Sequence, residues 1–181
     1  MESKDSWWEK KAVGNISETI VEMMVKSMPN WQCVRFGVEN HIEDLKKHII
    51  TNINPTTKKI KSMPDFIAFN TKTEETFFLE VKYRGFVDKR TAGKVEYKLD
   101  FLNEYLDHWK GTKLIIVHGH SPYFFVINLD DVKQTMCRKE YDGYRYECYW
   151  DFGGIQKGIK DIFPEMSEDI IKRAIDMIPK K

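Results

Sequence analysis

The sequence predicts an α/β protein with one helix before a group of strands and a second helix among them. Three observations predict this fold class. An amphipathic helical segment opens the chain, and three apolar segments with β-type composition follow it. A second helical segment then precedes another buried strand, and a further strand comes after it. The expected order of the core elements is therefore helix, strand, strand, strand, helix, strand.

Length and composition favour a single packed domain over residues 1–181, with an insertion at 39–62 and a hairpin and helix extension at 130–181. Lys and Arg together number 29 against 28 acidic residues, so any basic surface that binds nucleic acid has to be local. The three cysteines lie far apart, and no apolar run is long enough to cross a membrane. We expect a cytoplasmic protein without a disulfide framework and without a membrane partner.

The first helix is expected from Ser6 to Met28, where Pro29 and Asn30 end it. Its buried stripe carries apolar residues at helical spacing, namely Val13, Ile16, Ile20, Met24 and Met28. Glu18 borders this stripe, and Glu22 lies one turn further on. Either glutamate can therefore lie near the core.

A strand is expected from Trp31 to Val38, and a short helix from His41 to Ile50. Asn54 and Pro55 mark a turn, so the sequence predicts a loop over Asn52 to Ser62. Three lysines of this loop, Lys58, Lys59 and Lys61, precede the next strand. They suit a phosphate backbone, although such a run is more often solvated surface.

The central hairpin runs from Met63 to Lys82, with a polar turn over residues 71–75. Alternation along its second strand places Phe78, Glu80 and Lys82 on one face, and Phe77, Leu79, Val81 and Tyr83 on the other. A carboxylate and an ammonium inside so apolar a strand indicate function, because burial of charge is costly unless the charge is paired or bound to metal. Asp65 brings a second carboxylate to the same end of the sheet.

Two carboxylates and a lysine are suited to metal-assisted hydrolysis of a phosphodiester. The carboxylates hold a hard cation such as Mg²⁺. The cation polarises the phosphate and activates a bound water, and the lysine orients that water or stabilises developing negative charge. An ordinary charged hairpin is the alternative interpretation of the same residues.

The arrangement of Pro64-Asp65 on one strand and Glu80-Val81-Lys82 on the next resembles the motif of the PD-(D/E)xK nuclease superfamily. The resemblance covers roughly Gly14 to Leu129 and implies the restriction-endonuclease-like αβββαβ core, in which a mixed central sheet is flanked by helices. It also implies Mg²⁺ or Mn²⁺ as the cofactor, held by Asp65, Glu80 and the backbone carbonyl of Val81, with Lys82 positioning the attacking water.

Many members of the superfamily carry a metal-site glutamate on the first core helix, four residues after a small residue. Gly14 to Glu18 is similar to that pattern, so the resemblance implies that Glu18 binds the metal directly or through water. Glu22 is the competing candidate, and a solvated helix glutamate is the plain alternative. No glycine pattern for nucleotide phosphates occurs, and we expect no nucleotide cofactor.

Local basic charge predicts the DNA-binding surface. The segment from Lys82 to Lys98 is expected as a loop that enters a helix over Lys94 to Trp109, and it carries excess positive charge beside the proposed site. The candidate DNA-binding residues are Arg84, Lys89, Arg90, Lys94 and Lys98. The alternative interpretation of this segment is a loop that only contributes to solubility. For Lys98, the alternative is a side chain that extends from the edge of the helix into water.

The remaining segment is expected to form a hairpin turn at Tyr141-Asp142-Gly143-Tyr144 and a final helix capped by Ser167. Aromatic residues surround the turn and suit either base stacking or cross-strand packing.

Taken with the resemblance, these features predict a metal-dependent DNA endonuclease. Within the superfamily, a chain of this size looks like a Holliday-junction resolvase or a restriction-type endonuclease. Both commonly act as homodimers, because each must cut two strands. The alternative is a non-catalytic DNA-binding or assembly module that retains the nuclease fold.

Overall fold

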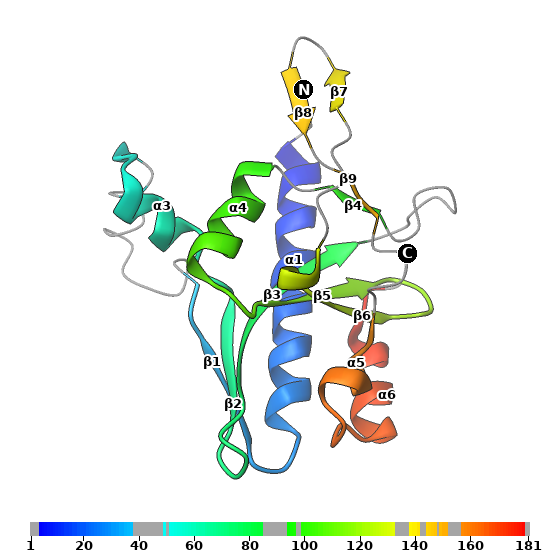
Figure 1. Cartoon of the computed structure of the whole chain (residues 1–181). Coiled ribbons are helices and arrows are strands. Elements are labelled where there is room, and N and C mark those ends of the chain that lie inside the picture. The colour runs from blue at the N-terminus through cyan, green and yellow to red at the C-terminus, as the bar shows by residue number, and fades with distance from the viewer. Residues whose placement is uncertain are drawn as a thin grey trace.

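A six-stranded mixed sheet forms the centre of the protein in the computed structural model (Figure 1). The structure describes residues 4–37, 49, 51–84, 94–96, 99–132, 138–141, 144–147, 149–151 and 157–179. The strands lie in the order β1-β2-β3-β5-β6-β10. Strands β3 and β5 are parallel, and every other neighbouring pair in this sheet is antiparallel. The expected α/β class with a mixed sheet is therefore confirmed.

The elements have the following bounds. The central sheet comprises β1 (Trp31–Arg35), β2 (Phe66–Asn70), β3 (Thr76–Arg84), β5 (Lys113–His118), β6 (Phe124–Asn128) and β10 (Lys157–Gly158). Two small sheets pair β4 (Lys94–Glu96) with β9 (Tyr149–Asp151), and β7 (Arg138–Tyr141) with β8 (Tyr144–Glu147). The helices are α1 (Lys4–Lys26), α3 (Pro55–Lys61), α4 (Leu99–His108), α5 (Ile159–Ile162), α6 (Glu168–Met177) and the 3-10 turn η2 (Leu129–Asp131).

Helices cover both faces of the central sheet. On one face, α1 and α6 pack with the sheet around a large apolar core that includes Ile20, Phe163 and Ala174. On the other face, Tyr105 of α4 packs with Leu114 and other buried residues of the sheet. The alternation of β5 between these two cores shows that both faces of the sheet are buried.

Strand β3 alternates between the two faces as the sequence predicts. Leu79 and Val81 lie in the core on the α1 side. Phe78 packs against Trp109 on the α4 side, and Glu80 and Lys82 follow it at the same alternation. Their partners on β5 are Leu114 and Ile116, which belong to the α4-side core. The expected division of β3 into two faces is confirmed.

Two expected elements differ in the structure. The predicted loop over 52–62 contains helix α3, because Asn54 caps it, Pro55 occupies its first turn, and Thr57 and Asn54 form a reciprocal capping box. The predicted helix over 94–109 begins only at Leu99, because residues 94–96 pair with β9 as a strand. Tertiary pairing overrides the helical spacing there.

Other expectations are confirmed at the element level. Strands β5 and β6 occur where apolar runs predict them, and β7 and β8 pair with Tyr141 opposite Tyr144. The Ser167 side chain accepts a hydrogen bond from Ile170 N–H and caps α6. The expected helix at 41–50 falls mostly outside the described residues. None of the helices in the described part of the chain has the length and apolar character needed to cross a membrane.

Candidate active site

Asp65 is fixed at the point where strands β2 and β3 stop pairing. Their ladder ends with Phe66, and Asp65 precedes it in the chain. The Asp65 carbonyl accepts a hydrogen bond from Phe36 N–H at 2.8 Å, which extends the pairing of β1 with β2. The Asp65 side chain reaches across to β3, where Oδ2 accepts a hydrogen bond from Val81 N–H at 2.7 Å. A carboxylate therefore replaces a backbone acceptor directly beside Glu80.

Glu80 and Lys82 form an ion pair on the α4-side face of β3. Glu80 Oε1 is paired with Lys82 Nζ, and the two side chains are 3% and 32% exposed. Burial of the glutamate follows from its neighbours, because Leu114 and Ile116 flank it on β5. The ammonium lies at the more open side of the pair.

The second oxygen of Glu80 is buried, and no residue that the structure describes donates a hydrogen bond to it. A buried carboxylate oxygen in that condition costs on the order of 1–3 kcal/mol or more, which calls for a specific explanation. A divalent cation is one ligand that would satisfy it. Together with the Asp65 carboxylate and the carbonyl of Val81, Glu80 supplies the hard oxygen donors that Mg²⁺ or Mn²⁺ prefers. The residues present therefore fit the predicted cofactor.

The charges of Asp65 and Glu80 interact. Burial and then the negative charge of Glu80 raise the pKa of Asp65 to about 8. The Lys82 ammonium and the hydrogen bond from Val81 oppose this rise without overcoming it. Two carboxylates whose charges repel in a buried place are an arrangement that a bound divalent cation stabilises.

Glu18 and Glu22 of α1 face different surroundings. Glu18 Oε2 lies 3.4 Å from Nη1 of Arg35 in β1, and the Glu18 side chain is 18% exposed. After burial and Glu80, the charge of Glu18 is a further cause that raises the pKa of Asp65. Glu22 instead forms two ion pairs: its Oε1 lies 2.7 Å from Lys26 Nζ, and its Oε2 lies 2.9 Å from Arg35 Nε. Of the two candidates, Glu18 is the one whose charge reaches Asp65.

The ionic partners of Glu22 also set its protonation. Burial raises the pKa of Glu22, but the hydrogen bonds from Lys26 and Arg35, together with the positive charges of these two residues, outweigh burial and hold the pKa below its usual value. Glu22 therefore links α1 to β1 through its ion pair with Arg35.

Arg35 is the residue near the site that sequence reasoning missed. Its guanidinium contacts Glu18 and Glu22 and lies 5.3 Å from the centre of the Phe66 ring. A signal was present, because Trp31, Cys33 and Arg35 share one face of β1 and the first two are buried. A charged residue in that row predicts an acidic partner on the helix that covers it.

The candidate DNA-binding residues are only partly described. Arg84 ends β3, and Lys94 lies in strand β4 rather than in the expected helix. Lys89, Arg90 and Lys98 fall outside the described residues. Within the described ranges, no group of three or more His, Cys, Asp or Glu side chains is arranged to hold a metal ion. The carboxylates that the structure brings together are the pair Asp65 and Glu80.

Comparison with known proteins adds no assignment: no protein-family model and no curated protein matches the chain.

Proposed function

We propose that the protein is a metal-dependent endonuclease that hydrolyses phosphodiester bonds in DNA, with a restriction-endonuclease-like core. The observation that carries this proposal is the convergence of Asp65, Glu80 and Lys82 at the end of one hairpin. These three residue types in the motif Pro-Asp and Glu-Val-Lys supply two metal-binding carboxylates and one cation. If the inserted helix α3 and the short strand β4 are left aside, the order α1-β1-β2-β3-α4-β5 follows the αβββαβ pattern and supports the same interpretation.

Each residue has a role in this proposal. Asp65, Glu80 and the Val81 carbonyl would hold Mg²⁺ or Mn²⁺, and Glu18 would contact it directly or through water. When bound, the cation supplies polarisation of the phosphate and a water of lowered pKa. Val81 N–H holds the Asp65 carboxylate in place, which leaves its other oxygen for binding.

Lys82 acts on the charge that develops during hydrolysis. Glu80 holds the Lys82 ammonium beside the site, and the Lys82 side chain is about one-third exposed, so a phosphate oxygen can approach it. In the proposed reaction, water adds to phosphorus and the ester oxygen departs with a proton. Lys82 orients that water and stabilises the extra negative charge on the phosphoryl oxygens.

A substrate panel tests the proposal. Purified protein is incubated with four-way, flap, single-stranded and plain duplex DNA, with Mg²⁺, with Mn²⁺ and with EDTA. We expect cleavage that requires added metal and that disappears in D65N and E80Q, while E165Q, a change at an exposed glutamate on another part of the fold, cleaves like the parent. Preference for the four-way junction would indicate a resolvase-like enzyme, and preference for duplex a restriction-type one.

Binding of these DNAs without cleavage of any of them would overturn the nuclease proposal. That result would favour the alternative, a non-catalytic DNA-binding or assembly module. Size measurement in the same preparation tests the expected homodimer, since a nuclease that cuts both strands commonly uses two sites.

A further inference from the structure

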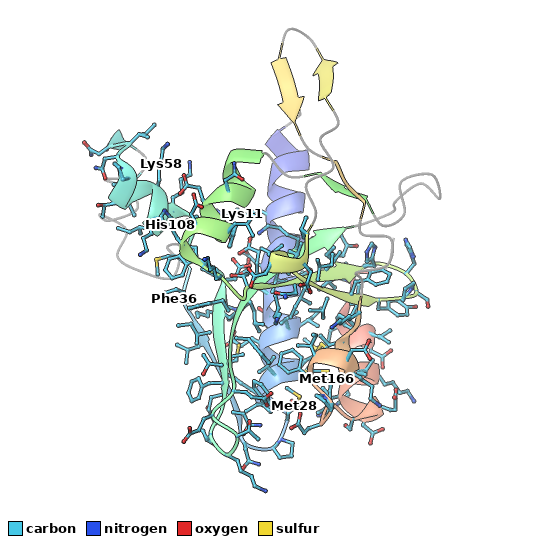
Figure 2. All side chains as sticks on the ribbon, viewed as in Figure 1. Lys11, Met28, Phe36, Lys58, His108 and Met166 are labelled. Carbon is cyan, nitrogen blue, oxygen red and sulfur yellow. The ribbon has the colours of Figure 1, made fainter. Side chains whose placement is uncertain are left out.

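Helix α3 presents three lysines to solvent. Lys58, Lys59 and Lys61 are all exposed, and the helix PTTKKIK contains no acidic residue. None of the three makes an ion pair with a residue that the structure describes. We refer to Lys58, Lys59 and Lys61 as the α3 lysines. Figure 2 shows Lys58 and the other side chains of α3 projecting from one side of the molecule.

The helix that carries these lysines is well defined locally. Asn54 Oδ1 accepts a hydrogen bond from Thr57 N–H at 3.0 Å, and Thr57 Oγ1 accepts one from Asn54 N–H at 2.8 Å. Such a reciprocal cap fixes the first turn of a helix that would otherwise be too short to persist. The α3 lysines are therefore displayed from a defined backbone.

Trp109 attaches α3 to the body of the protein. Its Nε1–H donates to Ser62 Oγ at 3.2 Å, directly after the helix. Lys59 Nζ lies 5.7 Å from the centre of the Trp109 ring, within the range of a cation–π contact. Trp109 also packs edge-on against Phe36 and Phe78, at centroid distances of 5.4 and 5.5 Å. Helix α3 is thus attached to an aromatic cluster through Lys59 and Ser62.

The same aromatic cluster contacts the candidate active site. Phe36 N–H donates to the carbonyl of Asp65 at 2.8 Å. Phe78 precedes Glu80 by two residues on the same face of β3 and packs against Trp109. The chain itself gives a second link, because only Ser62, Met63 and Pro64 separate Lys61 from Asp65. Helix α3, which carries the α3 lysines, is therefore attached to the same part of the fold as the two carboxylates.

An upper bound on that distance follows from backbone geometry. Four residue steps from Lys61 to Asp65 span at most about 14 Å between Cα atoms. One strand of B-DNA advances about 3.4 Å per phosphate along the helix axis, so this span equals the axial rise of about four nucleotides, which is an upper limit because the strand also winds around the axis. A strand whose phosphate lies at Asp65 and Glu80 brings its neighbouring phosphates within reach of the α3 lysines.

We propose that the α3 lysines bind the phosphate backbone of the DNA substrate within about four nucleotides of the cleaved bond. The inference rests on the proposed function, since it takes DNA as the substrate. It assigns substrate binding to a helix in the segment that departs from the compact core pattern. These contacts are made to phosphates, so they position the DNA and do not read its sequence.

The test compares two variants of equal charge change. K58Q/K59Q/K61Q removes the α3 lysines and keeps residues that tolerate a helix. K72Q/K160Q/K172Q removes three exposed lysines in the β2–β3 turn and in α5 and α6. Both triple changes are made in the parental chain for cleavage, and in the E80Q background for binding, so that the DNA stays intact. Affinity for a labelled duplex is measured by fluorescence anisotropy at several salt concentrations.

We expect the α3 variant to bind DNA at least about tenfold more weakly at moderate salt. The slope of log affinity against log salt should become shallower by about 0.9 for each phosphate that the α3 lysines no longer neutralise. The control variant should keep most of the parental affinity and slope. A parallel set of duplexes carries neutral methylphosphonate linkages at successive positions. Linkages within about four nucleotides of the cut should weaken binding by the parent but not by the α3 variant.

The possible outcomes separate the two proposals. Equal affinity and slope for the α3 variant and the parent, with cleavage abolished by D65N, would overturn this inference and leave the nuclease proposal standing. Equal losses of affinity in the α3 and control variants would also overturn it, because the effect would then be one of net charge. A third outcome is a slope of log affinity against log salt that becomes shallower in the α3 variant, in a protein that cuts no DNA. This result would support DNA binding by the α3 lysines and overturn the nuclease proposal.

Discussion

Asp65 and Val81 are joined by a 2.7 Å hydrogen bond from the backbone N–H of Val81 to the Asp65 carboxylate, across two neighbouring strands. The bond stands where the β2–β3 ladder has ended, so a side chain completes the hydrogen bonding of β3. This bond fixes one carboxylate oxygen beside Val81, the residue that follows Glu80. Cleavage, stability and pH dependence should all respond to changes at these residues and at their immediate neighbours.

D65N should abolish cleavage and preserve the fold. Asparagine keeps an oxygen that can accept from Val81 N–H, but it loses the negative charge that a divalent cation needs. We expect the cleavage rate to fall at least about a hundredfold, since a metal's stabilisation of the transition state is worth several kcal/mol. Single-turnover cleavage with Mg²⁺ measures the rate, and circular dichroism checks the fold. Parental cleavage by D65N would remove Asp65 from the mechanism.

Stability without metal should fall as the pH rises from 5 to 8. The folded protein retains the Asp65 proton up to about pH 8, because burial and then Glu80 raise its pKa, whereas the unfolded chain loses this proton near the ordinary value of 3.8. The folded state therefore binds more protons across this interval, and its free energy of unfolding decreases with pH. D65N lacks this titration. Urea unfolding in EDTA should show D65N gaining up to about 4 kcal/mol on the parent between pH 5 and pH 8. A constant difference would contradict the raised pKa.

K82M should destabilise the protein as well as inactivate it. Removing the ammonium leaves the Glu80 carboxylate buried without its charge partner. We expect a loss of about 2 kcal/mol in the free energy of unfolding, below the full cost for a wholly buried pair because Lys82 is partly exposed. Adding E80Q to K82M removes the stranded charge and should restore most of the loss. If E80Q/K82M is less stable than K82M, the ion pair does not explain the effect.

Glu18 and Glu22 should respond differently to the same change. E18Q removes a charge that reaches Asp65, and we expect weaker cleavage and a higher Mg²⁺ requirement. E22Q removes a partner of Lys26 and Arg35 that lies outside the proposed chemistry, and should cost about 0.5–1 kcal/mol of stability with nearly parental cleavage. Magnesium titrations of cleavage by both variants measure this contrast. The reverse ranking would make Glu22 the metal-site glutamate.

The sequence predicts strand β3 well because two short-range signals agree there. Period-2 alternation assigns its two faces, and the charges at Glu80 and Lys82 mark the candidate functional face. The pairing of β2 with β3 follows from the short polar turn that joins them. The candidate site could therefore be predicted from local pattern, without knowledge of long-range packing.

Elements whose signals are ambiguous or long-range were harder to predict. Asn54-Pro55 marks a turn, yet the same dipeptide is also a good helix start, and the capping residue Thr57 decides between them. Lys94 lies in a strand because β9, far along the chain, pairs with it. The two-residue strand β10 has no sequence pattern of its own and exists through its pairing with β6.

Helices α1 and α6 come from opposite ends of the described chain and share one core, in which Ile20 of α1 and Ala174 of α6 are fully buried. During synthesis α1 leaves the ribosome before α6, so the apolar side of α1 cannot be covered by α6 until α6 has been translated. Completion of this core thus depends on contacts between segments that are far apart in the sequence, and such contacts form slowly.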